Sequence, residues 1–496
     1  MKKLFSILLA ITMLFSVFTA LADSSGGTPP GDSPEGFGNG NPPGDPPGEP
    51  PEGFGNGNPP GEPPEGFGGG NPPGDPPGGF GGGTPPGGRT SSFTYTAAEE
   101  IGADSALKTR IDETYTSDTA DENALMLTAA GITLDNPTVT KTGDSDGGDN
   151  CNFYGLNAAV LLKDGADVVI TGGTVDSSAS GANGVFCYGG NGGRNGAEGD
   201  GTTLHIYDTV ITTTGDGSGG IMTTGGGVTY AENLTVTTSG RSSAPIRTDR
   251  GGGTVNVDGG TYTTNGLGSP AIYSAADITV KNASLVSNLS EGVCIEGMNS
   301  ITLENCDLTA DNTQCNGNAT FLDTIMIYQS MSGDADSGTS SFTMTGGSLT
   351  SLSGHMFHVT NTHAVISLSG VDLINKGSDI LLSVCDDGWN GASNIAELNA
   401  DAQALAGTVL VGSNSSLALS LANGSTFEGT FSGEITSAKG TLVSESLGSV
   451  TVSLDASSTW ILTADTWISG FSGDPANIIS GGYTLYVDGV ALEGTK

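Results

Sequence analysis

Residues 252–311 read GGTVNVDGGTYTTNGLGSPAIYSAADITVKNASLVSNLSEGVCIEGMNSITLENCDLTAD and repeat one short pattern three times, as VNVDGGTY, ITVKNASL and ITLENCDL. Each copy has two apolar residues two positions apart, a Gly or Asn two positions later, and an apolar or aromatic residue three positions after that. The Gly or Asn markers of the three copies, Gly259, Asn282 and Asn305, are 23 residues apart at each step. A short, fixed period of this kind is typical of stacked backbone coils, so the stretch predicts a solenoid.

The same pattern continues in both directions along the chain. Successive markers are separated by 36, 36, 25, 26, 23, 23, 41 and 24 residues, and they are Asn136, Gly172, Asp208, Asn233, Gly259, Asn282, Asn305, Gly346 and Gly370. The basic coil therefore has 23 to 26 residues, and three coils carry insertions. Thr229 and Ala231 occupy the two apolar positions before Asn233, so we expect that coil to be shifted by one residue.

Every coil contains a further apolar segment before the next marker, for example AVLL, VFCY, AIYS or MIYQ. Three short strands per coil, separated by Gly, Asn and Asp turns, predict an all-β, right-handed parallel β-helix whose strands pair with their equivalents about 4.8 Å away. A jelly roll or β-sandwich is the alternative, but it gives no reason for a strict 23-residue spacing. We place regular coils at 124–395 and irregular C-terminal coils with a cap at 396–496, where LALSLANGSTF and VTVSLDASSTW align at an offset of 33.

The N-terminal part has a different composition. Residues 1–22 combine two lysines, a short apolar run and a small-residue site, which indicates a secretory signal peptide. Residues 23–90 hold 19 of the 23 prolines and favour a disordered spacer, because Pro and Gly oppose regular structure and little there is apolar. We assign 91–123 to an N-terminal cap, in which TAAEEIGADSALKTRI forms a short amphipathic turn or helix.

The chain is strongly acidic, with 54 Asp and Glu against 15 Lys and Arg and a formal charge of −39. Such a surface repels nucleic acid and anionic membranes, so neither is an expected partner. We also expect no transmembrane segment, since no run after the leader approaches the ~20 apolar residues that a spanning helix needs. The sequence predicts a secreted protein, with attachment to the cell surface left open.

Aligned strand segments predict one candidate binding strip. They put Arg247, Tyr273, Glu296, Tyr328 and His358 in equivalent outward positions, and Asp249 and Arg250 follow just beyond Arg247 in the stretch RSSAPIRTDRGGG. Guanidinium groups bind sugar carboxylates or hydroxyls, and tyrosine faces stack on pyranose rings. The alternative is that the two arginines pair internally with nearby acidic residues.

Two other sets of residues have potential ligand or cross-link chemistry. Asp144, Asp146 and Asp149 alternate in TGDSDGGDN and suggest a calcium site, although the terminal Glu of an EF-hand loop is missing. Cys306 and Cys315 flank the start of the insertion in the 41-residue coil and form the best disulfide candidate. Cys187, Cys294 and Cys385 fall in or beside apolar segments, where buried free thiols are expected.

The repeats TVNVDGGTYTTNG and ITLENCDLTADN, behind a signal peptide and a Pro/Gly spacer, resemble the right-handed parallel β-helix proteins of bacterial secretomes, adhesin-like relatives of the pectin-lyase-like fold. The resemblance covers about residues 120–496. Members with polygalacturonase-like activity carry an Asn-Thr-Asp, a paired Asp, a Gly-His-Gly and an Arg-x-Lys. Here the paired Asp at 386–387 stands alone, and Gly354-His355 is followed by Met356, so the resemblance implies an incomplete catalytic set.

Three functions follow as hypotheses. The first is a non-catalytic, exported β-helix that acts as an adhesin or binds glycans of the extracellular milieu or of a neighbouring cell. The second is a polysaccharide lyase or glycosidase on the same fold. The third is binding to ice or another crystal surface, and it depends on outward threonines, namely Thr138, Thr174, Thr235 and Thr261 with Thr140, Thr237 and Thr263.

Overall fold

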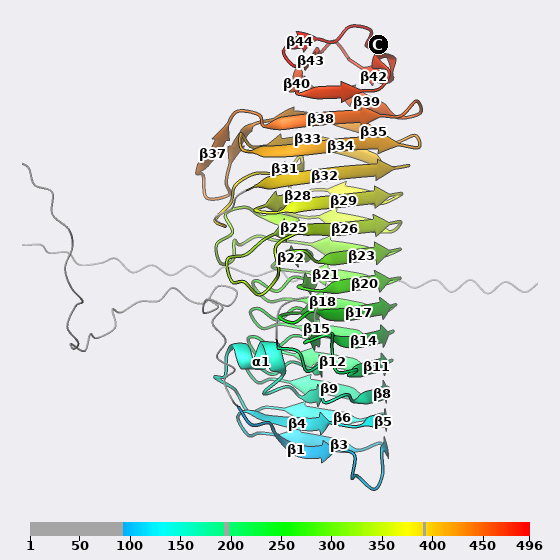
Figure 1. The fold of residues 1–496 in the computed structure, drawn as a ribbon, viewed down its shortest axis with the longest axis vertical. Coiled ribbons are helices and arrows are strands. Elements are labelled where there is room, and N and C mark those ends of the chain that lie inside the picture. Colours follow the sequence, from blue (N-terminus) through cyan, green and yellow to red (C-terminus); the bar gives the residue numbers. More distant parts are fainter. Residues whose placement is uncertain (1–92, 193–197, 390–392) are drawn as a thin grey trace, which may run out of the picture. The chain divides into compact units, whose positions relative to one another are not determined.

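A computed structural model describes residues 93–192, 198–389 and 393–496, so the predicted leader at 1–22 and spacer at 23–90 lie outside the described residues. The described chain winds into a β-helix whose strands lie like rungs above one another (Figure 1). Three long sheets, called A, B and C here, consist entirely of parallel pairs, which confirms the predicted fold class. Within the described residues, no helix is long and apolar enough to cross a membrane.

Sheet A has 15 strands among the described residues, in the order β1 (Thr96–Ile101), β4 (Glu122–Leu127), β7 (Val160–Leu162), β10 (Val185–Tyr188), β13 (Ile221–Thr224), β16 (Ile246–Thr248), β19 (Ile272–Ser274), β22 (Val293–Glu296), β25 (Asp323–Tyr328), β28 (His355–Thr360), β31 (Ile380–Val384), β33 (Ala404–Val411), β35 (Thr426–Ser432), β39 (Thr459–Leu462) and β42 (Ile478–Ile479). Its middle strands are the additional apolar segments of the sequence pattern.

Sheet B has 14 strands within the same ranges, in the order β2 (Thr109–Ile111), β5 (Ala130–Asp135), β8 (Asp167–Thr171), β11 (Thr203–Tyr207), β14 (Gly227–Glu232), β17 (Gly253–Asp258), β20 (Asp277–Lys281), β23 (Ser300–Glu304), β26 (Thr339–Thr345), β29 (His363–Ser369), β32 (Asn394–Asp401), β34 (Ser415–Ala422), β38 (Ser449–Leu454) and β41 (Gly470–Ser472).

Sheet C has ten strands in the described part of the chain, in the order β3 (Thr114–Ser117), β6 (Thr138–Lys141), β9 (Thr174–Ser177), β12 (Val210–Thr213), β15 (Thr235–Thr238), β18 (Thr261–Thr264), β21 (Ser284–Ser287), β24 (Asp307–Ala310), β27 (Ser348–Ser351) and β30 (Asp372–Asn375). Three-stranded coils therefore end at β30, before the predicted boundary at 395. The predicted offset of 33 holds beyond it, because Leu417 of β34 aligns with Val450 of β38.

The sequence markers are the residues at the corner between sheets B and C. All nine have a positive φ, between 50° and 72°, in the left-handed region that Gly, Asn and Asp tolerate best. Their backbone amides continue the ladder through the corner: Asn282 N–H donates to Glu304 O at 2.9 Å, and Gly259 N–H donates to Lys281 O at 2.8 Å. The repeat of Gly, Asn and Asp is therefore a repeat of one backbone conformation.

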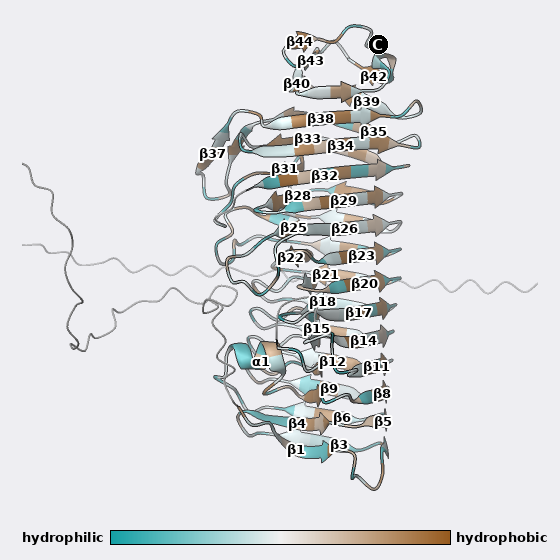
Figure 2. Cartoon of the chain, in the orientation of Figure 1, coloured by the Kyte–Doolittle hydropathy of each residue, from teal (hydrophilic) through white to brown (hydrophobic). Residues whose placement is uncertain are grey.

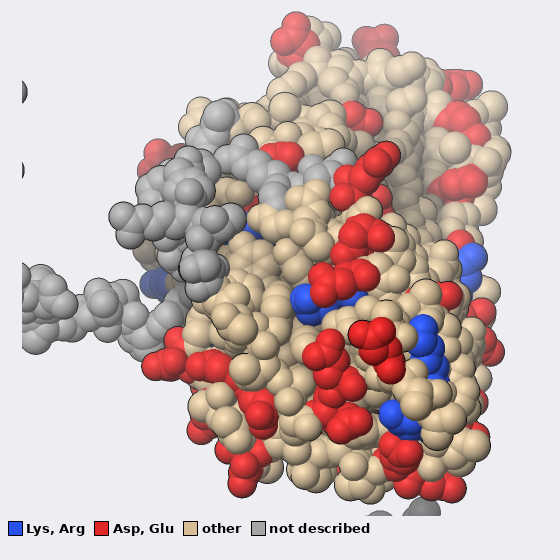
Figure 3. Space-filling model, turned by 60° about the horizontal axis from the view of Figure 1, so that its bottom comes forward, with Lys and Arg blue, Asp and Glu red and all other residues tan. Residues whose placement is uncertain are grey.

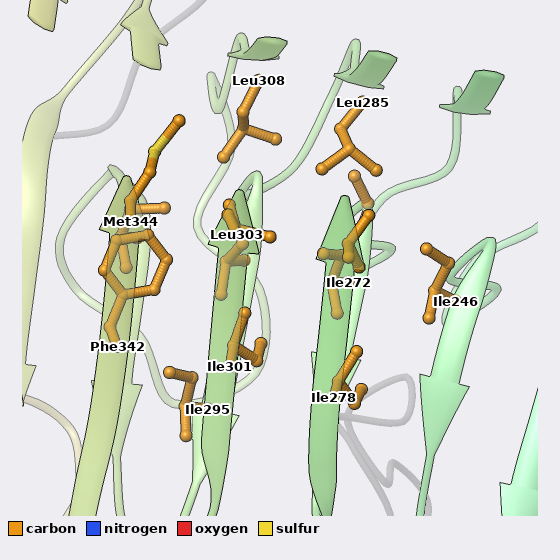
Figure 4. Close-up of a cluster of buried hydrophobic side chains, with 14 of the residues drawn as sticks. Ile246, Ile272, Ile278, Leu285, Ile295, Ile301, Leu303, Leu308, Phe342 and Met344 are labelled. Carbon is orange, nitrogen blue, oxygen red and sulfur yellow. The ribbon is translucent and has the colours of Figure 1, made fainter. Parts of the chain in front are cut away.

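The core consists of stacked aliphatic side chains between the three sheets. Ile278 and Ile301 align in adjacent coils of sheet B, and both are at most 1% exposed. Figure 4 shows these residues with Leu285 and Leu308 of sheet C, all pointing into the same interior. Figure 2 shows hydrophobic and hydrophilic residues interspersed along the strands, as expected when alternate side chains face the core.

The coil at Asn233 corrects one expectation. Thr229 and Ala231 stay in register with Val255 and Val257 and are buried, so this coil is not shifted. The polar Thr229 side chain is accepted in the core because its hydroxyl bonds that of Thr223 at 2.7 Å.

The N-terminal segment 91–123 is also different from the prediction. Among its described residues it forms no helix but a first coil, with β1, β2 and β3 pairing in parallel with β4, β5 and β6. Helix propensity is overridden here because the edge of each sheet offers the backbone hydrogen-bond partners of a strand. Exposed Glu99 and Glu100 place charge on the terminal strand β1, which disfavours further strand addition.

Insertions project from one side of the coil stack. They include the short helix α1 (Asp149–Tyr154) and an antiparallel hairpin of β36 (Glu434–Thr436) and β37 (Leu442–Glu445), both on the left in Figure 1. The C-terminal end adds a small sheet of β40 (Thr466–Ile468), β43 (Leu485–Val487) and β44 (Val490–Ala491), and a 3-10 turn at Pro475–Asn477. Trp460 is fully buried against Phe427 in the last coils, whereas Trp467 is 52% exposed.

Candidate functional site

The predicted strip lies on the outer side of sheet A, but in two neighbouring rows. Tyr273 aligns with Arg247 on one side and with Cys294 on the other, while Glu296, two residues later, aligns with Tyr328. His358 aligns with Met326 and so belongs to the Arg247 row. The structure therefore does not put these residues in fully equivalent positions.

The strip is covered rather than exposed. Six of its seven residues are at most 7% exposed, and only Arg250 is half-buried. The covering groups come from α1, from the loop 329–338 and from residues 386–389, as the contacts below show.

Both arginines of the strip are paired with carboxylates. Arg247 Nη2 lies 2.9 Å from Asp249 Oδ2, and its Nη1 donates to Asn152 of α1 at 3.3 Å. Arg250 donates through Nε to Asp334 Oδ1 at 3.1 Å, and its guanidinium lies 4.3 Å from the ring centre of Phe153. This is the internal pairing that the sequence left open as the alternative.

Burial governs the protonation of Asp249. It raises the pKa of this carboxyl to about 7, although the charge of Arg247 acts in the opposite direction. The neighbouring Asp334 carboxylate contributes further to the increase. Asp249 is therefore an acid that titrates near neutral pH inside the covered side of sheet A.

Glu296 is the centre of a hydroxyl network. Its carboxylate accepts hydrogen bonds from the Tyr273 hydroxyl, from Tyr328 at 3.4 Å, from Ser330, and from Ser332 at 3.1 Å. Burial raises the pKa of Glu296, and the hydroxyl donors partly offset this by stabilising the charged form. Because two donors come from the sheet and two from the loop 329–338, the network ties this loop to the coil stack.

His358 belongs to a separate buried group. Its Nδ1 lies 2.8 Å from Ser383 Oγ, its Nε2 lies 3.4 Å from Asp387 Oδ2, and its ring stacks on Phe321 with centroids 4.8 Å apart. The order Ser, His, Asp is that of a nucleophilic triad. Ser383 and His358 are completely buried, however, so a substrate has no route to the hydroxyl without movement of the covering residues.

The two remaining sequence candidates are not assembled. Asp144 accepts the Ser180 amide at 2.8 Å, Asp149 begins α1, and no group of three or more His, Cys, Asp or Glu within the described ranges is arranged to hold a metal ion. All six cysteines are free thiols. Cys306 is buried in the core and donates to Val280 O at 3.3 Å, whereas Cys315 donates to Phe321 O, so the predicted disulfide is absent.

A different site lies on the outer face of sheet B, and the sequence reasoning missed it. Side chains of β11, β14, β17 and β20 line a surface pocket of about 390 Å³, and its polar and aromatic lining is His205, Tyr207, Tyr230, Glu232, Asn256, Asp258, Thr279 and Lys281. These residues follow from strand register: His205, Tyr230, Asn256 and Thr279 form one row, and Tyr207, Glu232, Asp258 and Lys281 form the next. In the sequence, the segments HIY, YAE, NVD and TVK precede four successive markers, and the first and third residue of each segment face outward. This alternation could have revealed the two rows.

The pocket contains an aromatic platform, which is formed by His205 and Tyr230. The rings of His205 and Tyr230 are stacked, with centroids 5.0 Å apart and planes inclined by 11°. Tyr230 is 43% exposed, a large fraction for an aromatic side chain. An exposed, flat ring beside polar groups offers apolar contact area next to hydrogen-bonding partners.

The rest of the pocket contains two acidic side chains and one basic side chain. Glu232 and Asp258 are exposed and directly aligned on adjacent strands. The Lys281 ammonium lies 2.9 Å from Glu304, and Asp258 accepts the Asn282 side-chain amide at 2.7 Å. Figure 3 shows the same imbalance on the face that it presents, where acidic side chains far outnumber basic ones.

Comparisons with known proteins add no assignment to this geometry: no family model, no curated protein and no solved structure matches the chain.

Proposed function

We propose that this protein is an exported, adhesin-like β-helix that binds extracellular glycans without catalysis, and that the pocket on sheet B is its binding site. The observation that carries the proposal is the stacked His205–Tyr230 platform, in which Tyr230 is exposed and His205 half-buried, in a pocket of about 390 Å³. Hydroxyl-binding groups surround this platform, among them Asn256, Thr279 and Glu232. The signal peptide and the Pro/Gly spacer predicted from the sequence support export.

Regular strand spacing suits an extended ligand. Equivalent side chains recur about every 4.8 Å along the stack, so the two polar rows of sheet B present a continuous surface to a chain of sugars. Because the site is built on strands, its side chains keep fixed positions relative to one another, which reduces the entropy lost on binding.

The test uses a glycan array followed by calorimetry with purified protein and its Tyr230→Ala variant. We expect binding to at least one oligosaccharide class and a loss of about two- to tenfold in the variant, because one stacking contact contributes roughly 0.5–1.5 kcal/mol. The matched control is Tyr483→Ala, since Tyr483 is 45% exposed but lies at the C-terminal end. Binding that both variants retain in full would contradict the assignment of the site.

A polysaccharide lyase or glycosidase is the alternative function, and its catalytic groups would have to be the arginines and carboxylates on the outer side of sheet A. Arg247 and Arg250 are already engaged by Asp249 and Asp334, and the carboxylate of Glu296 is surrounded by protein hydroxyls. These contacts favour an internal role for the cluster over a role in turnover. Release of unsaturated or reducing sugars from pectins, alginates or host glycans by the purified protein would reverse this preference.

Ice or crystal binding is a second candidate, because the threonine rows of sheet C are in register. Thr138, Thr174, Val210, Thr235 and Thr261 align on successive strands, and so do Thr140, Asp176, Thr212, Thr237 and Thr263. Threonine is also a strong strand former, and Val210 and Asp176 interrupt the two rows. Absence of thermal hysteresis in the purified protein would remove this candidate.

A further inference from the structure

The negative charge of the sheet B pocket favours one class of sugar over others. Glu232 and Asp258 are aligned on adjacent parallel strands, which places equivalent backbone positions about 4.8 Å apart. Both side chains are exposed, and like charges facing each other across a strand pair destabilise a sheet. Their presence beside the aromatic platform is therefore a cost to the fold that a bound cation would relieve.

Neighbouring groups compensate this negative charge only in part. Lys281, the cation of the pocket lining, is aligned with Asp258 on one side and paired with Glu304 at 2.9 Å on the other, so two carboxylates share its single charge. Asp258 accepts a hydrogen bond from the neutral side-chain amide of Asn282, and the Glu232 carboxylate makes no hydrogen bond or ion pair with any residue in the described ranges. A positively charged ligand group placed between the two carboxylates gains charge-assisted hydrogen bonds that a hydroxyl cannot equal.

The aromatic platform suits the same ligand. A tyrosine face attracts an ammonium group through the ring quadrupole while it stacks on the apolar face of the sugar ring. A uronic acid would instead bring its carboxylate beside Glu232 and Asp258 in a chain of formal charge −39.

We infer that the sheet B pocket binds glycans whose sugars carry a protonated amino group, as in glucosamine oligomers, and discriminates against polyuronates. This inference rests on the proposed glycan-binding function and assigns roles within it. Glu232 and Asp258 hold the ammonium group, and Tyr230 stacks on the ring.

Calorimetry tests the inference with three hexamers, of glucosamine, N-acetylglucosamine and galacturonate, at about pH 6, where the amine and the carboxylates are all charged. We expect the glucosamine hexamer to bind at least about tenfold tighter than the N-acetylated one, and the galacturonate hexamer not to bind. Glu232→Gln should remove most of that preference, because the amide keeps the shape of the side chain but carries no charge to pair with the ammonium group.

A control variant distinguishes binding at specific residues from the general attraction of a cation to an acidic protein. Asp176→Asn removes the same charge from the exposed outer row of sheet C and should leave glucosamine binding within about twofold of the original. Equal losses in Glu232→Gln and Asp176→Asn, or glucosamine binding that Tyr230→Ala does not change, would overturn the inference.

The remaining outcomes distinguish the inference from the proposed function. Tyr230-dependent binding of the neutral or the uronate hexamer, with no preference for the amine, would overturn the amino-sugar assignment and leave glycan binding in place. Absence of Tyr230-dependent binding to every oligosaccharide on the array and to all three hexamers would overturn both.

Discussion

Replacing Asn282 tests whether the positive φ of the corner between sheets B and C is the reason that Gly, Asn or Asp occupies each marker position. Asn282 has a φ of 52°, and its side-chain amide donates to Asp258 Oδ1 at 2.7 Å on the previous coil. Asn282→Ala puts an ordinary L-residue in the left-handed region at a cost of roughly 1–2 kcal/mol. It also removes an exposed hydrogen bond worth about 0.5 kcal/mol. We expect a total loss of about 2 kcal/mol.

Asn282→Gly separates the two contributions. Glycine adopts the same φ without strain, as Gly259 does at the equivalent corner of the previous coil, so this variant loses mainly the hydrogen bond and some backbone entropy. We expect a loss of about 1 kcal/mol or less, clearly smaller than that of the alanine variant.

Denaturant unfolding followed by circular dichroism measures both variants, with the midpoint compared at an unchanged slope. Hydrogen exchange at the corner amides gives a local readout, because the Asn282 amide donates to Glu304 O across the coils. Equal losses for alanine and glycine, or no loss for alanine, would refute the claim that backbone conformation selects the markers.

Three further predictions concern buried groups. Asp249 has a pKa raised to about 7 in the folded protein against an ordinary value near 3.8, so its contribution to stability is complete below about pH 4 and is lost as the pH rises through 7. Asp249→Asn should therefore flatten the dependence of the unfolding free energy on pH in that window, and a variant with an unchanged slope would contradict the shift. Glu296→Ala removes an acceptor that the Tyr273, Ser330 and Ser332 hydroxyls share and should destabilise the protein by about 3 kcal/mol, with faster hydrogen exchange in the loop 329–338. The matched control, exposed Glu232→Ala, should change stability by no more than about 0.5 kcal/mol. Thiol titration of the unreduced, denatured protein should give six reactive cysteines, whereas four would show that one disulfide had formed.

The pH prediction concerns only one of several buried acids that act in the same direction. Burial also raises the pKa of Glu291, just before β22, and of Asp323, at the start of β25, and the charge of Glu291 raises the pKa of Asp323 further. Both therefore favour folding at acidic pH, whereas the lowered pKa values of His355 and Asp387 favour folding at higher pH. Because these contributions oppose one another, the change in slope between Asp249→Asn and the original protein isolates the contribution of Asp249.

Much of the fold follows from local chemistry that is visible in the sequence. Each marker has to adopt a positive φ, and few residues other than Gly, Asn and Asp do so readily, so the corner between sheets B and C leaves a direct trace at Asn282 and Gly259. The apolar pairs before the markers are equally local, because alternate residues of a strand face the core. The repeat therefore determined the β-helix and its inward residues.

Tertiary structure alone decided which outward residues are accessible. Arg247 and Glu296 have the sequence positions of surface groups, yet α1 and the loop 329–338 cover them, and insertions carry no periodicity that would reveal where they fold back. Register likewise separated Glu296 from the Arg247 row, because a difference of two residues in strand alignment moves a side chain to a neighbouring row without changing its face. The pocket at Tyr230 depends on four strands from successive coils, so its residues became neighbours only when the coils stacked.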